Sequence, residues 1–166
     1  GISTLYSNTA TDIRIAGETG YAGIEFDQQK LLRYLDHGND AKDLIPILEH
    51  HGVEPRCINA LKRVELQGEQ HQEMIGVCER LCAAAEVIGC PVIQVVPFEG
   101  LAHLPWKESF ALTAGNIKEL AQVASDHGIG CQLEVLAWAP ICSLQHGLEL
   151  IDRVGMDNVQ MVIDFW

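Results

Sequence analysis

Apolar residues recur along the chain in two alternating patterns. The first pattern has helical spacing, so that its apolar positions fall on one face of a helix. It is clearest at Met74, Cys78, Leu81, Ala85 and Ile88, and again at Phe110, Ala114, Ile117, Ala121 and Ala124. The second pattern is a short, nearly continuous apolar run, which is typical of a strand buried on both faces. The alternation predicts helices and strands in turn.

A glycine marks five of the junctions between the two patterns. At each one an amphipathic stretch ends on glycine and an apolar run follows, at Gly20, Gly52, Gly89, Gly128 and Gly155. Glycine just past a helix end supplies the left-handed residue that closes the last turn. We therefore predict strands near residues 1–5, 23–27, 56–61, 92–97, 131–136 and 159–165, with helices between them.

Regular alternation of strands and helices predicts an α/β fold with a parallel sheet and right-handed crossovers. No GxGxxG motif follows the first predicted strand, which argues against a dinucleotide-binding fold. Polar and aromatic residues gather where the strands end, as in a (β/α)8 TIM barrel. The 166 residues would hold about six of eight βα units, so we expect one partial barrel domain over residues 1–166, a fragment of a longer protein.

Charge and composition exclude several classes of protein. Only 11 Lys and Arg oppose 23 Asp and Glu, for a net charge of −12, whereas proteins that follow nucleic acid need a basic face. The longest apolar stretches fall short of the roughly 20 residues that span a bilayer. Six cysteines form no CxxC pair, so we expect them to be reduced and buried in a cytoplasmic protein.

Glu134 is the sharpest candidate for chemistry. It stands in the apolar run 131–136, where an unpaired charge is costly, so it needs a partner. That partner is either a basic side chain of a neighbouring strand or a metal ion. Asp164 ends the next predicted strand, where the alternative role is a helix N-cap. Two carboxylates at neighbouring strand ends suit a hard divalent cation but leave its coordination incomplete.

Other strand ends carry candidate substrate contacts. Tyr6 and Asn59 lie at the ends of two predicted strands, and His103 and Trp106 lie in the longer loop after the fourth. Glu25 and Asp27 follow the same arrangement, with substrate contact and loop bonding equally open. The remaining histidines are interpreted as structural; His50, His51 and His127 would meet the negative end of a helix dipole.

Four segments together resemble a known family. They are Gly1–Leu5 (GISTL), Gly20–Phe26 (GYAGIEF), the pair Leu133–Glu134, and Val162–Trp166 (VIDFW). Their order and spacing resemble the xylose isomerase-like sugar phosphate isomerase/epimerase superfamily. The resemblance implies a (β/α)8 barrel with a divalent metal, Mn²⁺, Mg²⁺, Co²⁺ or Zn²⁺. Glu134 and Asp164 match its first two ligands, and a His and a Glu would follow beyond Trp166.

The resemblance also implies a reaction. Glu134 would be both a ligand and a catalytic acid/base that moves protons next to a carbonyl, through a metal-stabilised enediolate. A second Glu of the ketose epimerases is missing, since Trp138, Ala139 and Pro140 occupy that region. A sugar or polyol isomerase or epimerase therefore leads, with an inosose dehydratase-type lyase or a non-catalytic sugar-binding protein as alternatives. Family members often form homo-oligomers, and the acidic charge argues against the DNA-repair branch. The 166 residues alone are expected to be inactive.

Overall fold

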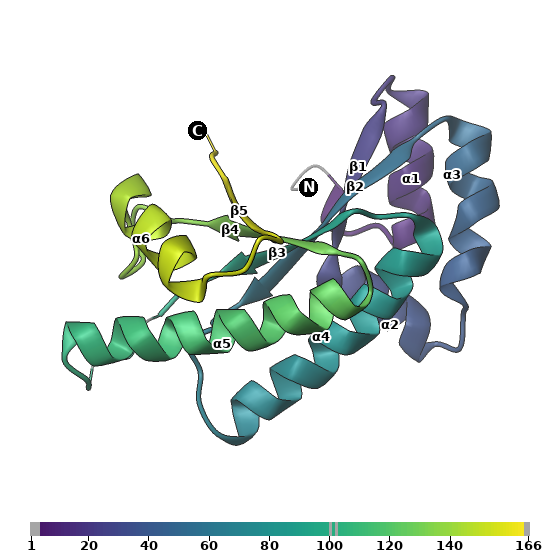
Figure 1. Cartoon of the computed structure of the whole chain (residues 1–166). Coiled ribbons are helices and arrows are strands. Elements are labelled where there is room, and N and C mark those ends of the chain that lie inside the picture. The colour runs from purple at the N-terminus through teal and green to yellow at the C-terminus, as the bar shows by residue number, and fades with distance from the viewer. Residues whose placement is uncertain (1–3, 100, 102, 165–166) are drawn as a thin grey trace.

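A computed structural model describes residues 4–99, 101 and 103–164 of the chain. Strands alternate with one or more helices along it (Figure 1). The elements are α1 (Thr9–Glu18), β1 (Gly23–Asp27), α2 (Gln28–Asp36), the 3₁₀ helix η2 (Ala41–Leu44), α3 (Ile45–His51), β2 (Glu54–Lys62), α4 (Glu69–Ile88), β3 (Val92–Val96), α5 (Trp106–Asp126), β4 (Gly130–Glu134), α6 (Leu144–Val154) and β5 (Val159–Val162).

The described strands form one parallel sheet in sequential order, β1-β2-β3-β4-β5. Every connection between neighbouring strands contains a helix, and Figure 1 shows the helices arranged around the outside of the sheet. Sequential parallel strands with helical crossovers are the arrangement of a barrel wall. The α/β prediction is confirmed, and the chain forms part of such a barrel.

The helix ends follow the glycine signals in the sequence. All five junction glycines have positive φ, between 63° and 83°. Gly89 illustrates the reason, because its left-handed conformation lets its own N–H and that of Cys90 bond back to the last turn of α4. Polar side chains cap other helix starts: Asn8 caps α1, Asp27 caps α2 and Ser143 caps α6.

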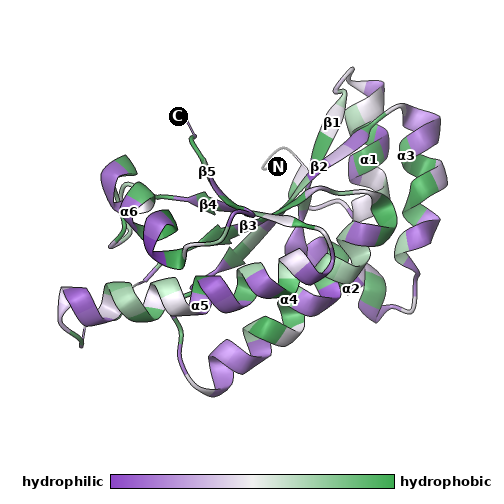
Figure 2. Cartoon of the chain, in the orientation of Figure 1, coloured by the Kyte–Doolittle hydropathy of each residue, from purple (hydrophilic) through white to green (hydrophobic). Residues whose placement is uncertain are grey.

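The two faces of the sheet differ in character. Side chains such as Ile93, Val95 and Leu133 point toward the helices and join one large buried core. Figure 2 shows the hydrophobic positions along the strands and the mixed surfaces of the helices around them. The alternate positions form the concave face, where a small second cluster, Ala60, Val96, Leu136 and Ala139, lies near the carboxyl ends of the strands.

Three sequence predictions are corrected by the structure. Of the strand predicted at 1–5, residues 1–3 lie outside the described residues, while Thr4 and Leu5 form a turn closed by hydrogen bonds from Ser7 to the Thr4 carbonyl. The last strand ends at Val162, earlier than predicted, and residues 165 and 166 are not described. Cys142 is exposed because it lies in the loop after β4, whereas the other five cysteines are buried.

No helix among the described residues combines the length and apolar character needed to cross a bilayer.

Candidate metal and substrate site

Glu134 and Asp164 lie at the ends of neighbouring strands. Glu134 ends β4 and pairs in register with Val162 of β5. Asp164 follows the end of β5 by two residues, and it is near enough for its charge to act on the Glu134 carboxyl. Glu134 is half-buried and Asp164 is exposed. Parallel pairing therefore brings the two predicted carboxylates to one edge of the sheet.

The electrostatics of Glu134 show which groups converge there. Burial raises the pKa of the Glu134 carboxyl, and the nearby carboxylates of Asp164 and Glu25 raise it further. A hydrogen bond from Gln94 and the positive charge of Lys62 oppose this shift. The negative charges of Asp164 and Glu25 therefore both act on Glu134. This arrangement is unfavourable unless a cation or a proton joins it.

The partner that Glu134 required is an amide. The Gln94 side chain donates from Nε2 to Oε2 of Glu134 at 2.6 Å, and Gln94 itself is only 3% exposed. The alternative of an ion pair to a neighbouring strand is not formed, since within the described residues no basic side chain forms a salt bridge with Glu134. A neutral donor brings no positive charge to the carboxylate, so Glu134 has only the non-contacting charge of Lys62 to oppose its own.

The donors present fit a hard divalent cation. Carboxylate oxygens are the ligands that Mg²⁺ and Mn²⁺ prefer. In the described part of the chain, no hydrogen bond reaches Oε1 of Glu134 or the carboxylate of Asp164. The same residues contain no group of three or more His, Cys, Asp or Glu side chains able to hold a metal. Two carboxylates are fewer donors than the complete coordination shell of such a cation needs.

A buried carboxylate secures the loop that leads from β3 into α5. Glu65 is fully buried after β2 and accepts hydrogen bonds from the backbone N–H groups of Phe98, at 3.2 Å, and Glu99. Asn116 of α5 ties the neighbouring segment by donating to the carbonyls of Val64 and Leu66. Glu65 was not predictable from the sequence, because the backbone N–H groups that donate to its carboxylate lie more than 30 residues further along the chain.

The loop residues predicted to meet substrate lie apart from Glu134 in the structure. Trp106 begins α5, is 46% exposed, and packs against Phe110 and against His146 of α6, with ring centroids 5.5 and 5.1 Å apart. His103 is exposed in the preceding loop. Within the described contacts neither residue touches Glu134, and their role in binding stays a prediction.

Tyr6 and Asn59 occupy different surroundings. Asn59 is half-buried in β2, in register with Asp27 of β1. Tyr6 is 98% exposed and lines an open hollow of about 910 Å³ between the start of α1 and α2. Asp27, which the sequence left open, bonds the backbone N–H of Lys30 at 3.0 Å and so caps α2. Glu25 is exposed on the concave face.

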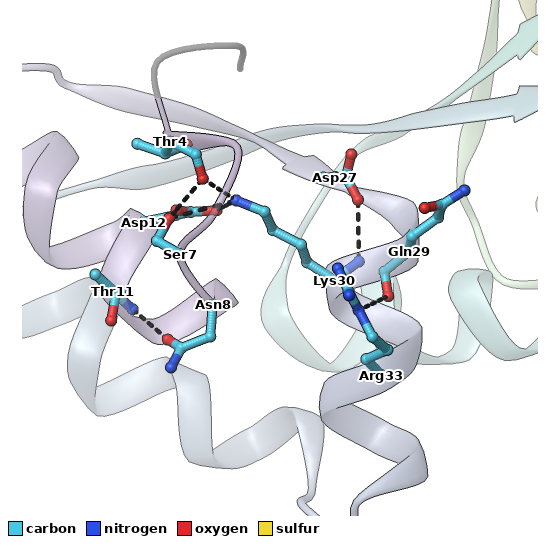
Figure 3. A network of polar contacts seen from close by, with 9 residues as sticks. All are labelled: Thr4, Ser7, Asn8, Thr11, Asp12, Asp27, Gln29, Lys30 and Arg33. Carbon is cyan, nitrogen blue, oxygen red and sulfur yellow. Dashed lines mark hydrogen bonds and ion pairs between the residues drawn. The ribbon is translucent and has the colours of Figure 1, made fainter.

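A closed polar network lies beneath that hollow (Figure 3). The Lys30 Nζ reaches from α2 to Oδ2 of Asp12 in α1 at 2.7 Å, with both side chains nearly buried. Lys30 also donates to the Thr4 carbonyl and, at 3.4 Å, to the Ser7 hydroxyl. Ser7 in turn bonds Asp12. Each charge in this network has its opposite, which is the pattern of a structural site.

Comparisons with known proteins agree with this architecture. The sequence pattern of a family described as xylose isomerase-like TIM barrel matches residues 13–166. A crystal structure of the IOLI protein with a bound zinc atom superposes with a TM-score of 0.84 at 25% identity, covering 98% of this chain and 60% of that one. The chain thus spans about three fifths of that relative's length. No match was found among curated proteins.

Two further solved structures share the fold at lower identity. The 3-keto-D-glucoside 4-epimerase YcjR from E. coli has a TM-score of 0.78 at 18% identity, with 93% of this chain and 62% of that one covered. The probable 3-DHS dehydratase AsbF from Bacillus anthracis has a TM-score of 0.79 at 17% identity, with 96% and 59% covered. At these identities the likeness establishes the fold alone.

Proposed function

The chain belongs to the xylose isomerase-like TIM barrel family. We propose that it acts as a divalent-metal-dependent isomerase or epimerase of a sugar or polyol. The observation that carries the proposal is the pair of Glu134, which ends β4, and Asp164, which follows β5, with no Lys, Arg or His among the described residues forming an ion pair with Glu134. The zinc atom in the IOLI structure supports a divalent ion at such a site.

Each residue has a distinct part in the proposed reaction. A bound divalent cation supplies positive charge that stabilises negative charge developing on a substrate carbonyl oxygen. Glu134 and Asp164 would hold that cation through carboxylate oxygens. Burial raises the pKa of Glu134, which brings it closer to the range where one carboxyl can both remove and return a proton near neutral pH. Glu134 would move the proton on the carbon next to the carbonyl.

Substrate contacts are proposed for the residues at the carboxyl ends of the strands. Trp106 offers half of its aromatic surface to solvent, as a platform for the apolar face of a sugar would need. Further hydrogen-bonding groups come from Asn59 in β2, His103 in the loop before α5 and Tyr6 in the turn before α1. Active sites of barrels are assembled at this end of the sheet.

An inosose dehydratase-type lyase is the second candidate function. It would use the same cation and the same proton abstraction, followed by loss of water. The fold similarity to the probable dehydratase AsbF is the observation in its favour. A sugar-binding protein without turnover is the third outcome that the experiment must distinguish.

Solvent deuterium exchange tests the proposal directly. The natural, full-length protein is incubated with Mn²⁺ and a panel of ketoses and inososes in D₂O, and the products are followed by NMR and mass spectrometry. An isomerase or epimerase incorporates deuterium next to the carbonyl without other change in mass, whereas a dehydratase yields a product lighter by one water. Binding without either change identifies a sugar-binding protein.

A matched pair of variants isolates the carboxylate. Glu134→Gln is expected to abolish deuterium incorporation and to weaken Mn²⁺ binding measured by calorimetry at least tenfold. Glu73→Gln, which removes an exposed carboxylate on α4, should change neither. Full turnover by the Glu134→Gln variant would eliminate the proposed role of Glu134.

A further inference from the structure

The concave face carries a row of amides at one level of the sheet. Gln94 of β3 pairs in register with Gln132 of β4, and Gln132 pairs with Gln160 of β5. Gln94 is almost fully buried, Gln132 is half-buried and Gln160 is exposed. Buried amides need hydrogen-bond partners, so the bonds they form in this row reveal how they are oriented.

The hydrogen bonds connect two of these amides to Glu134. Gln132 of β4 donates from Nε2 to Oε1 of Gln94 in β3 at 2.9 Å, and Gln94 donates from Nε2 to Oε2 of Glu134, back in β4, at 2.6 Å. The same Nε2 of Gln132 also donates to Sγ of Cys57 in β2 at 3.1 Å. Burial raises the pKa of the Cys57 thiol, so this sulfur is neutral.

Only one orientation of the Gln94 amide satisfies the Glu134 carboxylate. An ionised carboxylate only accepts hydrogen bonds, so the Nε2 end of Gln94 must face it. The Oε1 end of Gln94 then needs a donor, which Gln132 supplies. Glu134 sets the orientation of Gln94, and Gln132 holds the amide in that orientation.

From this geometry we infer that Gln94, held by Gln132, is the positioning residue that turns Glu134 toward the cation and the substrate. Gln94 occupies Oε2 of Glu134 and so directs Oε1 into the open side of the concave face. This inference rests on the proposed function, because it concerns the carboxylate that would act there. Outer hydrogen-bond partners of metal ligands commonly contribute about 10- to 100-fold in affinity.

The experiment has two independent readouts in the full chain. The first is the side-chain amide resonance of Gln94 in ¹⁵N NMR spectra, recorded without metal. Both Glu134→Ala and Gln132→Leu should shift it and speed its hydrogen exchange, and Gln160→Leu should not. An amide resonance that ignores the loss of Glu134 would overturn the inference whatever the chain binds.

The second readout is Mn²⁺ affinity by calorimetry, with thermal unfolding as a check on folding. Gln94→Met preserves the length of the side chain and removes its donor, and should weaken Mn²⁺ binding about 10- to 100-fold. Gln132→Leu should weaken it several-fold, and Gln160→Leu should leave it unchanged. Equal affinity in the Gln94→Met variant would overturn the positioning role.

The two proposals fail in distinguishable ways. If the wild-type chain shows the coupled Gln94 resonance but binds no Mn²⁺, the proposed metal-dependent function is wrong and the positioning role falls with it. If the wild-type chain binds Mn²⁺ and Gln94→Met binds it equally well, the function stands and only the positioning role is lost.

Discussion

The Lys30–Asp12 network and Glu134 both withdraw charge from water, but the charge is balanced differently in the two regions. In the first, a buried ammonium meets a buried carboxylate at 2.7 Å, and a serine and a carbonyl accept further hydrogen bonds from it. In the second, the half-buried Glu134 accepts one amide hydrogen bond, and burial and the charges of Asp164 and Glu25 raise its pKa. The first region pairs opposite charges, as structural sites do, whereas in the second Glu134 has no ion-pair partner among the described residues.

The largest expected change in the free energy of unfolding comes from a substitution in the Lys30–Asp12 network. Lys30→Met leaves Asp12 buried without its counter-charge, which should lower the free energy of unfolding by about 3–5 kcal/mol. Urea unfolding at pH 7 measures the loss. Lys42→Met, which breaks the exposed pair between Lys42 and Asp40, should leave the free energy of unfolding almost unchanged. Similar losses in the two variants would show that the buried pair does not carry the stability assigned to it.

A substitution on the concave face is expected to raise the free energy of unfolding instead of lowering it. Glu134→Gln keeps an acceptor for Gln94 while removing a charge that Asp164 and Glu25 repel. Because Glu134 is partly exposed, solvent screening limits the gain in unfolding free energy to about 0.5 kcal/mol. Unfolding of the wild type and the variant in metal-free buffer measures it. A marked loss of stability would mean that Glu134 is a structural residue, and the contrast with Lys30 would disappear.

The smallest expected effect concerns a charge that is paired but near the surface. His127 follows the last residue of α5. Its ring nitrogens Nδ1 and Nε2 contact the carboxylates of Glu86 at 2.8 Å and Glu79 at 3.0 Å, both from α4. These bonds, with Glu86 the larger cause, raise the pKa of His127 to about 9 from 6.5. The folded state therefore holds the proton more tightly than the unfolded state. The stabilisation is complete below pH 6.5 and is lost as the pH rises to 9.

Comparing His127→Gln with the wild type tests this pH dependence. The variant should be less stable at pH 6 by about 0.5 kcal/mol, and the difference should vanish at about pH 10. His50→Gln, at an exposed histidine of α3, serves as the control. A deficit independent of pH would assign the effect to packing instead of charge.

Much of the fold could be predicted because its signals are local. The positive-φ glycines and the apolar stripe of α4 both reflect interactions within a few residues, and both predictions are confirmed. The turn at Thr4 was missed because Ser7 closes it with a hydrogen bond that an apolar run does not reveal. Cys142 was predicted to be buried from composition alone, which carries no information on the loop that exposes it.

The candidate site divides in the same way. The cost of a charge in an apolar strand identified Glu134, and the repeat of that arrangement identified Asp164. The partner of Glu134 was not predictable, because Gln94 lies 40 residues away and its amide carries no mark of what it bonds. Gln94 is recognisable in the sequence as a polar residue inside an apolar run, but only the register of β3 with β4 relates it to the site.

The sequence by itself determined the βα alternation, the helix ends and the residues whose burial demands a partner, because these follow from hydrophobic spacing and backbone conformation over short distances. The tertiary structure alone decided that Lys30 meets Asp12, that Glu65 secures the backbone after β3, and that Gln132 holds Gln94 in its orientation toward Glu134. Hydrogen bonds and ion pairs depend on distances of about 3 Å, which only the register and packing of distant segments can set.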